Sequence, residues 1–522
     1  MKKILKKLKP QKEKILKIIK LFFNFVIIFI ALIIIFSTNW TIKNCQFDNF
    51  DQILFTLNSS VTTASNSMVN DFIIDNILVP FIITIVILII ILLIKYIFRK
   101  KNAYLTITII KLNKTIKLNF KTILKLLLLF SLLGYSIYYA MSNLYIFNYI
   151  KYSYIESNFF EVSYKDPKTV KLEFPKKKRN LIYIFLESME STYTNKENGG
   201  AYNEDYMTEL RELAKNNINF SNTNLVGGAH MPFGASWTIA ATIAQTSGVP
   251  LKSNFAQNDE ESYKNGLVNG AYSIGEILKE EGYRNYIMVG SDLTFGGRRV
   301  YYKEHGDYKV YDYYTAIKDN IIDDGYYVNW GYEDKKLFEY AKEELTKISK
   351  SDKPFDFTML TADTHFSDGY MDNSCEIISD DHYLNSVHCS SKKLNDFIKW
   401  IKKQDFYKNT TIILVGDHLS MNTYSFEEID PNYERSVYNV FINSAIDTNC
   451  NKNRSFNTFD YYPTTLAALG VKIEGERLGL GTNLFSCKET LSEEYGNDYI
   501  DERIKEKSLY YNECISNKCE KK

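Results

Sequence analysis

The sequence predicts an α/β protein in two parts: N-terminal transmembrane helices, and then an extracytoplasmic domain with a mixed, largely parallel sheet flanked by helices. Three observations lead to this fold class. The first 146 of the 522 residues contain long apolar runs without charge. Lysine and arginine gather in the segments between alternate runs. From residue 180 onward, short apolar strands alternate with helical segments, as in a parallel sheet covered on both faces.

The membrane part is expected to comprise residues 1–146. Residues 21–40 (LFFNFVIIFIALIIIFSTNW) carry no charge over a length that matches the apolar core of a bilayer. A second apolar run covers residues 77–94, and a weaker third run covers residues 126–146. A cleaved signal peptide is disfavoured for the first run because the run is long and lacks a small-residue cleavage site. About three transmembrane helices are therefore expected.

Charge bias sets the expected topology. The net charge is only +1, but the first 20 residues hold nine lysines and one acidic residue. Residues 95–125 hold nine lysines or arginines and no acid, whereas residues 41–76 hold one lysine and four aspartates. Positively charged loops tend to stay in the cytoplasm. The N-terminus and the second loop are therefore expected inside, and the large C-terminal part outside, a bacterial cytoplasmic membrane with several spans.

Cysteine usage agrees with an external domain. Six of the seven cysteines lie beyond residue 370, and Cys45 falls in the first external loop. An oxidising compartment allows pairs such as Cys375 with Cys389 and Cys514 with Cys519. Sequence does not fix the connectivity, some or all thiols could remain free, and the odd count leaves at least one unpaired within the chain.

Beyond the membrane part we expect a juxtamembrane linker at 147–179, a catalytic domain at 180–487 and a charged tail at 488–522. The linker is polar and aromatic and ends in the charged PKKKR run. In the domain, continuous apolar runs predict buried parallel strands, and amphipathic segments predict helices. The expected strands lie at 181–186, 286–289, 355–360 and 411–415, and the expected helices at 274–281, 334–350 and 391–403.

Polar residues follow three of these strands. Glu187 closes the first, His365 follows the strand at 355–360, and Asp417 and His418 follow the strand at 411–415. Open α/β sheets place ligands at the carboxyl ends of their strands. Any one of these residues could be an ordinary surface or capping residue, but two carboxylates and an imidazole together suit a divalent metal of the manganese or zinc type.

Thr238 lies in the stretch GASWTIAATIAQTSGVPL, at the start of an expected helix. A threonine there is most often a cap for the free amides of the first turn. The same amides and the helix dipole also suit a phosphate beside the hydroxyl. If Thr238 joins the metal, the cation lowers the pKa of the hydroxyl and makes Thr238 a candidate nucleophile for phosphoryl-type transfer.

Several ordered blocks resemble the membrane phosphoglycerol transferases, in the sulfatase-like branch of the alkaline phosphatase superfamily, and more distantly the lipoteichoic acid synthases. A sulfatase would need a C/S-x-P-x-R signature for its formylglycine, and Thr238 is followed by IAAT instead, so sulfate-ester hydrolysis is not expected. The resemblance covers roughly residues 180–485 in the blocks NLIYIFLESMESTY, GASWTIAATIAQTSGVPL, SDLTFGGRRVYYKEHG, LTADTHFSDGY, LNSVHCSSKKLNDFI, ILVGDHLSMN and RLGLGTNLF.

The resemblance implies roles for individual residues. Glu187, Asp417 and His418 would bind the metal, usually Mn2+, with Zn2+ or Mg2+ possible, and Thr238 would complete the coordination as the nucleophile. His365 would lie beside the headgroup phosphate. The resemblance also implies that a basic residue contacts the substrate: Arg298, with Arg299 as the neighbouring choice. Just before these residues, Gly296-Gly297 replaces a tryptophan-asparagine pair of the lipoteichoic acid enzymes.

Four further residues have weaker assignments. Trp237 could wall the headgroup pocket, although core packing is the commoner role, and Trp330 and Asp334 could shape the site. We expect a structural role for His388. The implied reaction transfers phosphoglycerol from the lipid phosphatidylglycerol to a glycan or polyol hydroxyl on the periplasmic or cell-surface side, and no nucleic-acid partner is expected. The alternatives are a phosphoethanolamine transferase and a catalytically inactive relative that binds lipid or glycan.

Overall fold

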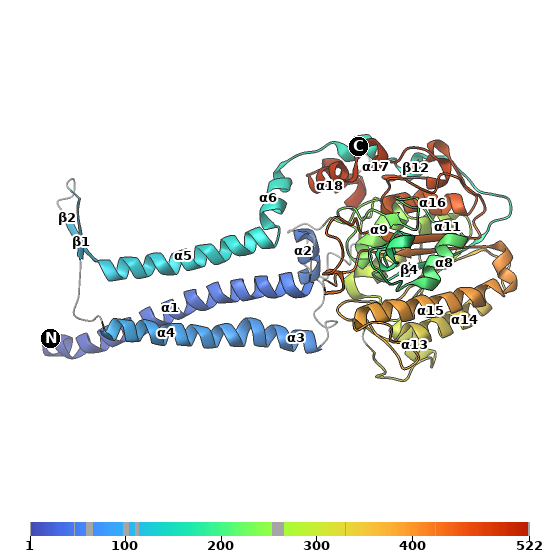
Figure 1. The fold of residues 1–522 in the computed structure, drawn as a ribbon. Helices are drawn as coiled ribbons and strands as arrows, with labels where there is room; N and C mark the ends of the chain where they lie inside the picture. The colour runs from blue at the N-terminus through green and yellow to red at the C-terminus, as the bar shows by residue number, and fades with distance from the viewer. Residues whose placement is uncertain are drawn as a thin grey trace. The chain divides into compact units, whose positions relative to one another are not determined.

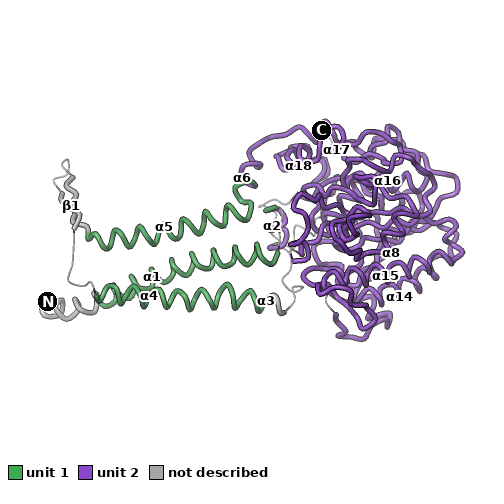
Figure 2. Tube along the Cα trace, in the orientation of Figure 1, with its two compact units in different colours: residues 1–50, 64–148 green, residues 51–63, 149–522 purple. Residues whose placement is uncertain are grey.

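The structure is a computed structural model that describes residues 2–519 apart from 46, 48, 59–65, 98–103, 110–113, 253–265, 329 and 423. It divides into two compact units, which Figure 2 shows in different colours. The first unit contains residues 1–50 and 64–148. The second contains residues 51–63 and 149–522, so one short segment between the first two apolar helices belongs to the C-terminal unit.

The first unit is helical. Within the described residues, three helical stretches are long and apolar enough to cross a membrane: Lys14–Cys45, Val69–Ile97 and Phe120–Asn143. Ile27, Ile28, Leu88 and Leu129 form a small buried cluster between these helices. The elements are α1 (Lys2–Cys45), α3 (Asn66–Ile73), a π-helical turn (Ile74–Leu78), α4 (Val79–Ile97), the strands β1 (Tyr104–Ile109) and β2 (Lys114–Asn119), and α5 (Phe120–Asn143). Helix α6 (Ile146–Tyr154) begins in this unit and continues into the second unit, which resumes at residue 149.

The second unit is built on a seven-stranded mixed sheet. The central strands pair in parallel, whereas β10 pairs antiparallel with both β9 and β5. This sheet confirms the predicted fold class. In spatial order the strands are β5 (Gly228–Ala229), β10 (Val437–Ile442), β9 (Thr410–Gly416), β4 (Asn180–Leu186), β8 (Phe355–Leu360), β6 (Arg284–Val289) and β7 (Lys309–Tyr311).

Helices cover both faces of this sheet (Figure 1). Helices α14 and α15 lie side by side, and their Phe338 and Phe397 rings stack with centroids 4.9 Å apart. The helices of the unit are α2 (Phe50–Asn58), α7 (Phe159–Ser163), α8 (Thr208–Asn216), α9 (Thr238–Ser247), α11 (Ile274–Glu280), α12 (Arg298–Glu304), α13 (Tyr313–Lys318), α14 (Asp334–Ile348), α15 (His382–Lys402), α16 (Tyr461–Ala468), α17 (Leu491–Tyr495) and α18 (Asn497–Lys505).

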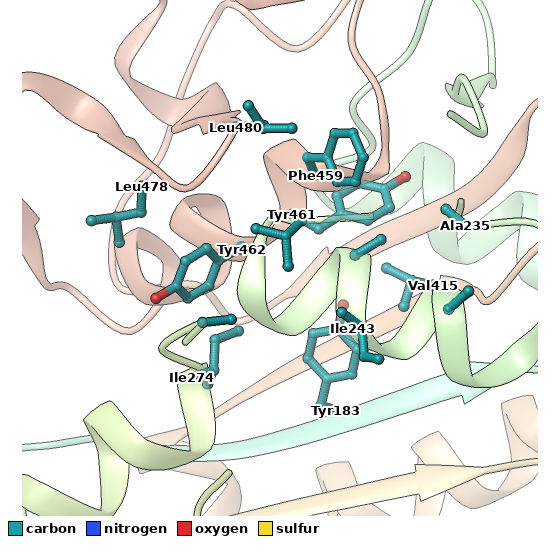
Figure 3. Close-up of a cluster of buried hydrophobic side chains, with 14 of the residues drawn as sticks. Tyr183, Ala235, Ile243, Ile274, Val415, Phe459, Tyr461, Tyr462, Leu478 and Leu480 are labelled. Atoms are coloured by element: carbon teal, nitrogen blue, oxygen red, sulfur yellow. The ribbon is translucent and has the colours of Figure 1, made fainter. Parts of the chain in front are cut away.

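The central strand β4 contributes side chains to two hydrophobic cores. Alternate side chains of a strand point to opposite faces, so Tyr183 joins the core beneath α9 and α16 whereas Ile184 joins the core beneath α14 and α15. Figure 3 shows the first core, where Tyr183 and Ile243 gather with the aromatic rings of α16. Because both faces are buried, β4 reads as one continuous apolar run, which is why the sequence predicts it well.

The last segment of the chain packs onto the second unit. Residues 488–522, expected as a charged tail, form α17 and α18, and Ile500 and Ile504 of α18 are buried in the first core.

Two of the disulfides join the suggested pairs, Cys375 with Cys389 and Cys514 with Cys519. A third disulfide joins Cys450 to Cys487, and Cys45 is free and buried.

Candidate active site

Two neighbouring parallel strands bring the predicted metal ligands together. Strands β4 and β9 pair in register, with Leu186 opposite Gly416, so the next residue of each chain segment falls at the same sheet edge. Those residues are Glu187 and Asp417. Together with His418 they form a buried group whose ligand atoms all lie within 4.8 Å of one another.

Hydrogen bonds orient this group. Oδ1 of Asp417 accepts from the backbone amides of Ser188 and His418, both at 2.8 Å. The His418 ring donates from Nδ1 to the carbonyl of Leu419, which leaves Nε2 facing the carboxylates, 3.5 Å from Glu187 Oε1 and 3.4 Å from Asp417 Oδ2. Oδ2 of Asp417 is buried and has no hydrogen-bond partner among the described residues.

The electrostatics of the group fit a divalent cation. Burial, together with repulsion from Glu187, raises the pKa of Asp417 to about 7. Burial alone would raise the pKa of Glu187, but the nearby His365 and His418 rings and the hydroxyl of Ser188 lower it. Two adjacent buried carboxylates with an imidazole nitrogen form a donor set for Mn2+ or Zn2+, whose charge would offset their repulsion.

Thr238 is the first residue of α9. The N-cap of this helix is Trp237, in extended conformation, and no side chain in the described part of the chain makes a capping hydrogen bond there. The interpretation of Thr238 as a helix cap is therefore wrong. Among the residues that the structure describes, no side chain accepts from the first-turn amides of α9, and such amides suit the oxygens of a phosphoryl group.

Helix α9 is fixed to the strand that carries the metal ligands. Nε2 of Gln245 donates to the carbonyls of Gly416 and Asp417, both at 3.0 Å. Gln245 lies two turns after Thr238 and hence on the same face of the helix. The loop that precedes α9 is linked to the same region, because the amide of Leu419 donates to the sulfur of Met231 at 3.3 Å.

His365 lies on the loop that follows β8. Its Nδ1 is 2.8 Å from the carbonyl of Phe366, which can only accept, so Nδ1 carries the proton and Nε2 is left for a substrate. The ring contacts Trp330, with centroids 4.2 Å apart. Burial lowers the pKa of His365, although the neighbouring Glu187 opposes that effect. The neutral ring is therefore the favoured form near pH 7.

The two arginines of the Gly-Gly-Arg-Arg block have different surroundings. Gly296 and Gly297 both adopt left-handed conformations, with φ of 63° and 73°, and the turn they make starts α12 at Arg298. Arg298 is 7% exposed, and its guanidinium donates to the carbonyls of Phe295 and Asp292 and to the hydroxyl of Ser291. Arg299 instead forms an ion pair with Asp312.

Trp237 lies at the junction of several site loops. It is 8% exposed, and its Nε1 and the neighbouring Oγ of Ser236 are buried without a hydrogen-bond partner among the described residues. Its ring packs against Phe55 of α2, with centroids 5.4 Å apart. Nε2 of Gln52, also on α2, is 3.5 Å from both the carbonyl of Ser236 and the sulfur of Met421.

The contribution of α2 to this site was not predicted from the sequence. Its apolar residues have the pattern of any short helix near a membrane, and their partners lie far away along the chain. Buried ion pairs were also missed: Glu190 is fully buried and pairs with Arg435 while accepting from the amide of Ser420 at 2.7 Å. An acid and an arginine separated by so many residues carry no local pattern.

Two of the weaker assignments lie near His365. The carboxylate of Asp334 accepts from the amides of Ala362, at 2.7 Å, and Asp363, at 3.1 Å, and so shapes the loop that leads to His365. Trp330 contacts the His365 ring directly. His388 is buried on α15, beside the disulfide-bonded Cys389, in agreement with a structural role.

Comparison with known proteins places this site in a family. A profile of the sulfatase family matches residues 179–471, the stretch that holds Glu187, Asp417 and His418. The chain belongs to the sulfatase family. Phosphoglycerol transferase I of Escherichia fergusonii is 31% identical over 358 residues, which are 67% of this chain and 43% of that protein. This identity agrees with the resemblance to membrane phosphoglycerol transferases. The chain spans less than half the length of the curated relatives it matches.

Two solved structures illustrate what this chain is similar to. The lipoteichoic acid synthase LtaP from Listeria monocytogenes is 18% identical, with 61% of this chain and 79% of that chain covered and a TM-score of 0.47. The lipooligosaccharide phosphoethanolamine transferase A (EptA) from Neisseria meningitidis is 13% identical, with 86% and 84% covered and a TM-score of 0.48.

Proposed function

We propose that this sulfatase-family protein is a membrane-anchored phosphoglycerol transferase. The observation that carries the proposal is its 31% identity to phosphoglycerol transferase I over 358 residues. The buried Glu187–Asp417–His418 group and the uncapped start of α9 at Thr238 support it. The catalytic domain corresponds to residues 180–487, and the three apolar helices would hold it at the outer face of the cytoplasmic membrane.

The reaction proceeds by covalent catalysis at Thr238. Oγ1 attacks the phosphorus of phosphatidylglycerol, the bond from phosphorus to the diacylglycerol oxygen breaks, and diacylglycerol leaves with a proton. The phosphoglycerol group is then esterified to Thr238. In the second step a glycan or polyol hydroxyl attacks the same phosphorus, and the bond to Oγ1 breaks. The hydroxyl proton passes to the released threonine oxygen.

The surrounding residues bind and orient the donor. Glu187, Asp417 and His418 would hold a divalent cation, Mn2+ being the expected one, which lowers the pKa of the nearby hydroxyl when bound. The first amides of α9 would donate hydrogen bonds to the phosphoryl oxygens as negative charge builds on them. His365 would lie beside the headgroup phosphate, whose negative charge favours protonation of Nε2, so that Nε2 donates to a phosphoryl oxygen. The fixed guanidinium of Arg298 would bind the same phosphate, and Trp237 would form a wall of the headgroup pocket. Tethering near the membrane keeps the lipid donor at high effective concentration.

The test measures diacylglycerol release from labelled phosphatidylglycerol by the full-length protein in detergent with Mn2+. Thr238→Ala is expected to abolish release, whereas Thr238→Ser retains a hydroxyl and is expected to keep part of it. Thermal unfolding of both variants checks that the fold survives. Substantial release by Thr238→Ala would contradict the assignment of the nucleophile.

Mass spectrometry of the trapped threonine adduct identifies the donor. A phosphoglycerol increment on the peptide that contains Thr238 supports the proposal. A phosphoethanolamine increment would make phosphatidylethanolamine the donor and the alternative transferase the correct one. No metal-dependent release from either lipid would identify an inactive, binding relative.

A further inference from the structure

A buried tyrosine at the start of α15 contacts the loops that carry the predicted site residues. Tyr383 is the second residue of α15, and its backbone amide donates to the side chain of the N-cap Asp381 at 2.8 Å. Only 1% of Tyr383 is exposed. Its hydroxyl has a hydrogen-bonding neighbour on each of the loops that follow β4, β8 and β9. These loops carry the predicted metal ligands and His365.

The neighbour on the loop after β8 lies next to His365. The Tyr383 hydroxyl donates to the carbonyl of Thr364 at 3.1 Å, and Thr364 directly precedes His365. Oγ1 of Thr364 in turn donates to the carbonyl of Glu187 at 2.6 Å. Burial raises the pKa of Tyr383, so the hydroxyl keeps the proton that it donates. The residue before His365 is thus held between α15 and a predicted metal ligand.

The other two neighbours lie beside the predicted metal ligands. Oγ of Ser420, two residues after His418, donates to the Tyr383 hydroxyl at 2.7 Å. The Tyr193 hydroxyl lies 3.4 Å from the Tyr383 hydroxyl and 3.2 Å from the carbonyl of Ser188, so its one proton is shared between two acceptors. Ser188 directly follows the first metal ligand. One phenol oxygen therefore connects the loops of the metal group with the loop after β8.

The proposed reaction depends on the separation between His365 and the metal group. The metal group would serve the nucleophile, whereas His365 would bind the phosphate under attack. Contacts with Phe366 and Trp330 orient the His365 ring. The position of its loop relative to the metal group depends on the hydrogen bonds of Thr364 and Tyr383. Misplacement of a reacting group by about 1 Å can cost about a hundredfold in rate.

We propose that Tyr383 is a positioning residue, whose hydroxyl holds the loop of His365 at the distance from the metal group that phosphoryl transfer requires. The inference rests on the proposed function and adds a residue that acts on the reaction through His365. The role belongs to the hydroxyl, because the ring alone cannot make the hydrogen bonds to Thr364 and Ser420. A buried polar network of this kind makes one arrangement of the loops rigid when its members are satisfied.

The test compares two buried tyrosines. Tyr383→Phe removes the hydroxyl and keeps the ring. Nζ of Lys393, also on α15, lies 2.9 Å from Oδ2 of Asp363 and still ties the loop after β8 to the helix, so the variant is expected to fold. Tyr438→Phe is the matched control, because Tyr438 is fully buried in the same core and its hydroxyl donates to the carbonyl of Leu210 on α8, at 2.7 Å.

Diacylglycerol release by the full-length protein in detergent is measured with saturating Mn2+ over a range of donor concentrations. Tyr383→Phe is expected to lower kcat by about tenfold and to leave the KM for phosphatidylglycerol within about threefold, because a displaced His365 costs most in the transition state. Tyr438→Phe is expected to keep both constants within about twofold. Thermal unfolding checks that the two variants lose similar stability. Equal kcat values for the two variants would overturn the proposed role.

The affinity for Mn2+ separates positioning of His365 from support of the metal group. It is measured for Tyr383→Phe by electron paramagnetic resonance of the free ion. It is expected to stay within about threefold of wild type, because the amides of Ser188 and His418 orient Asp417 without Tyr383. A loss of about tenfold or more would show that Tyr383 supports the metal group instead, and would contradict its action through His365.

A double variant tests the dependence on His365. Adding Tyr383→Phe to His365→Ala is expected to change kcat by less than about twofold, because the residue that Tyr383 positions is already absent. The same loss in both backgrounds would show that Tyr383 acts on another group and would overturn the inference. A wild-type protein that releases diacylglycerol from neither phosphatidylglycerol nor phosphatidylethanolamine would instead contradict the proposed function, on which the inference rests.

Discussion

Neighbouring arginines give a sharp test of the donor site at the scale of single residues. Arg298 is held by three acceptors with its guanidinium close enough to Glu187 for their charges to interact, whereas Arg299 is occupied by Asp312. A lysine keeps the charge but cannot make these three hydrogen bonds, so its charge would no longer be held in a fixed place beside the donor. Arg298→Lys is therefore expected to lower kcat/KM for the lipid donor by roughly 10- to 100-fold.

The matched variant is Arg299→Lys, expected to change kcat/KM by less than about threefold because a lysine can still pair with the buried carboxylate of Asp312. Both variants are measured by diacylglycerol release across a range of donor concentrations. A larger loss in Arg299→Lys than in Arg298→Lys would reassign the basic substrate residue to the second arginine.

A second residue, Asp356, predicts a pH dependence of stability. It is buried in β8, accepts from the hydroxyls of Tyr308 at 2.6 Å and Thr358 at 3.0 Å, and burial raises its pKa to about 7. The folded state then binds the proton more tightly than the unfolded state, so stability falls as the pH rises from the unfolded pKa to about 7. Asp356→Asn keeps an acceptor for Tyr308 and removes this titration.

The expected result is a melting temperature a few degrees above wild type at about pH 8, and little gain at about pH 3, where the wild-type carboxyl is mostly protonated in both states. Thermal unfolding of the detergent-solubilised protein at the two pH values measures it. A gain of the same size at both pH values would show that ionisation of Asp356 is not the cause.

At the scale of elements, α2 comes from the N-terminal part of the chain but packs against the candidate active site of the second unit. Phe55 packs against Trp237, which directly precedes Thr238. Phe55→Ala removes that support, and a small displacement of the nucleophile is costly, so kcat is expected to fall by about ten- to a hundredfold. Leu57, on the same helix but 73% exposed, is the control, and Leu57→Ala is expected to retain activity.

Diacylglycerol release is measured for both α2 variants, with Trp fluorescence as a reporter of the surroundings of Trp237. Equal activity in Phe55→Ala and Leu57→Ala, with a changed fluorescence in the former alone, would show that α2 packs on the domain without supporting catalysis.

The sequence predicts the elements whose pattern is local. Strands β4 and β9 contain continuous apolar runs because both sheet faces are covered, and β8 has apolar residues on either side of Asp356 and Thr358; all three strands are confirmed. Strand β10 was not predicted, because its run is interrupted by Asn439, whose side chain makes hydrogen bonds with the backbone of Phe220. Such a polar residue is compatible with a central strand only through a partner distant in sequence.

The same distinction holds for the site. Glu187, Asp417 and His418 each follow a recognisable strand, and parallel strands bring their carboxyl ends to one edge, so the cluster could be predicted. The contribution of α2 to the site and the burial of the C-terminal helices depend on tertiary packing. In α18 only Ile500 and Ile504, one turn apart among charged residues, mark the buried face.

For the whole molecule, the three disulfides predict an order of stabilisation. They close loops with sequence separations of 37 residues (Cys450–Cys487), 14 (Cys375–Cys389) and 5 (Cys514–Cys519). Loop-closure entropy assigns them about 4, about 3 and about 2 kcal/mol. Replacing each pair by serines is expected to lower the melting temperature in that order, as measured by thermal unfolding of the three variants. The reverse order would show that native contacts, rather than loop length, set the effect.

The placement of residues 51–63 in the C-terminal unit has a consequence for biosynthesis. Helix α2 leaves the ribosome long before the strands that form its unit, so Ile53, Leu54 and Phe55, which end up buried, must wait for partners. The last strand of the central sheet to be made, β10, ends at Ile442, and α18 comes later still. The unit can therefore complete its folding only after synthesis is nearly finished. Helix α2 is synthesised first, and the segments that bury it are synthesised much later.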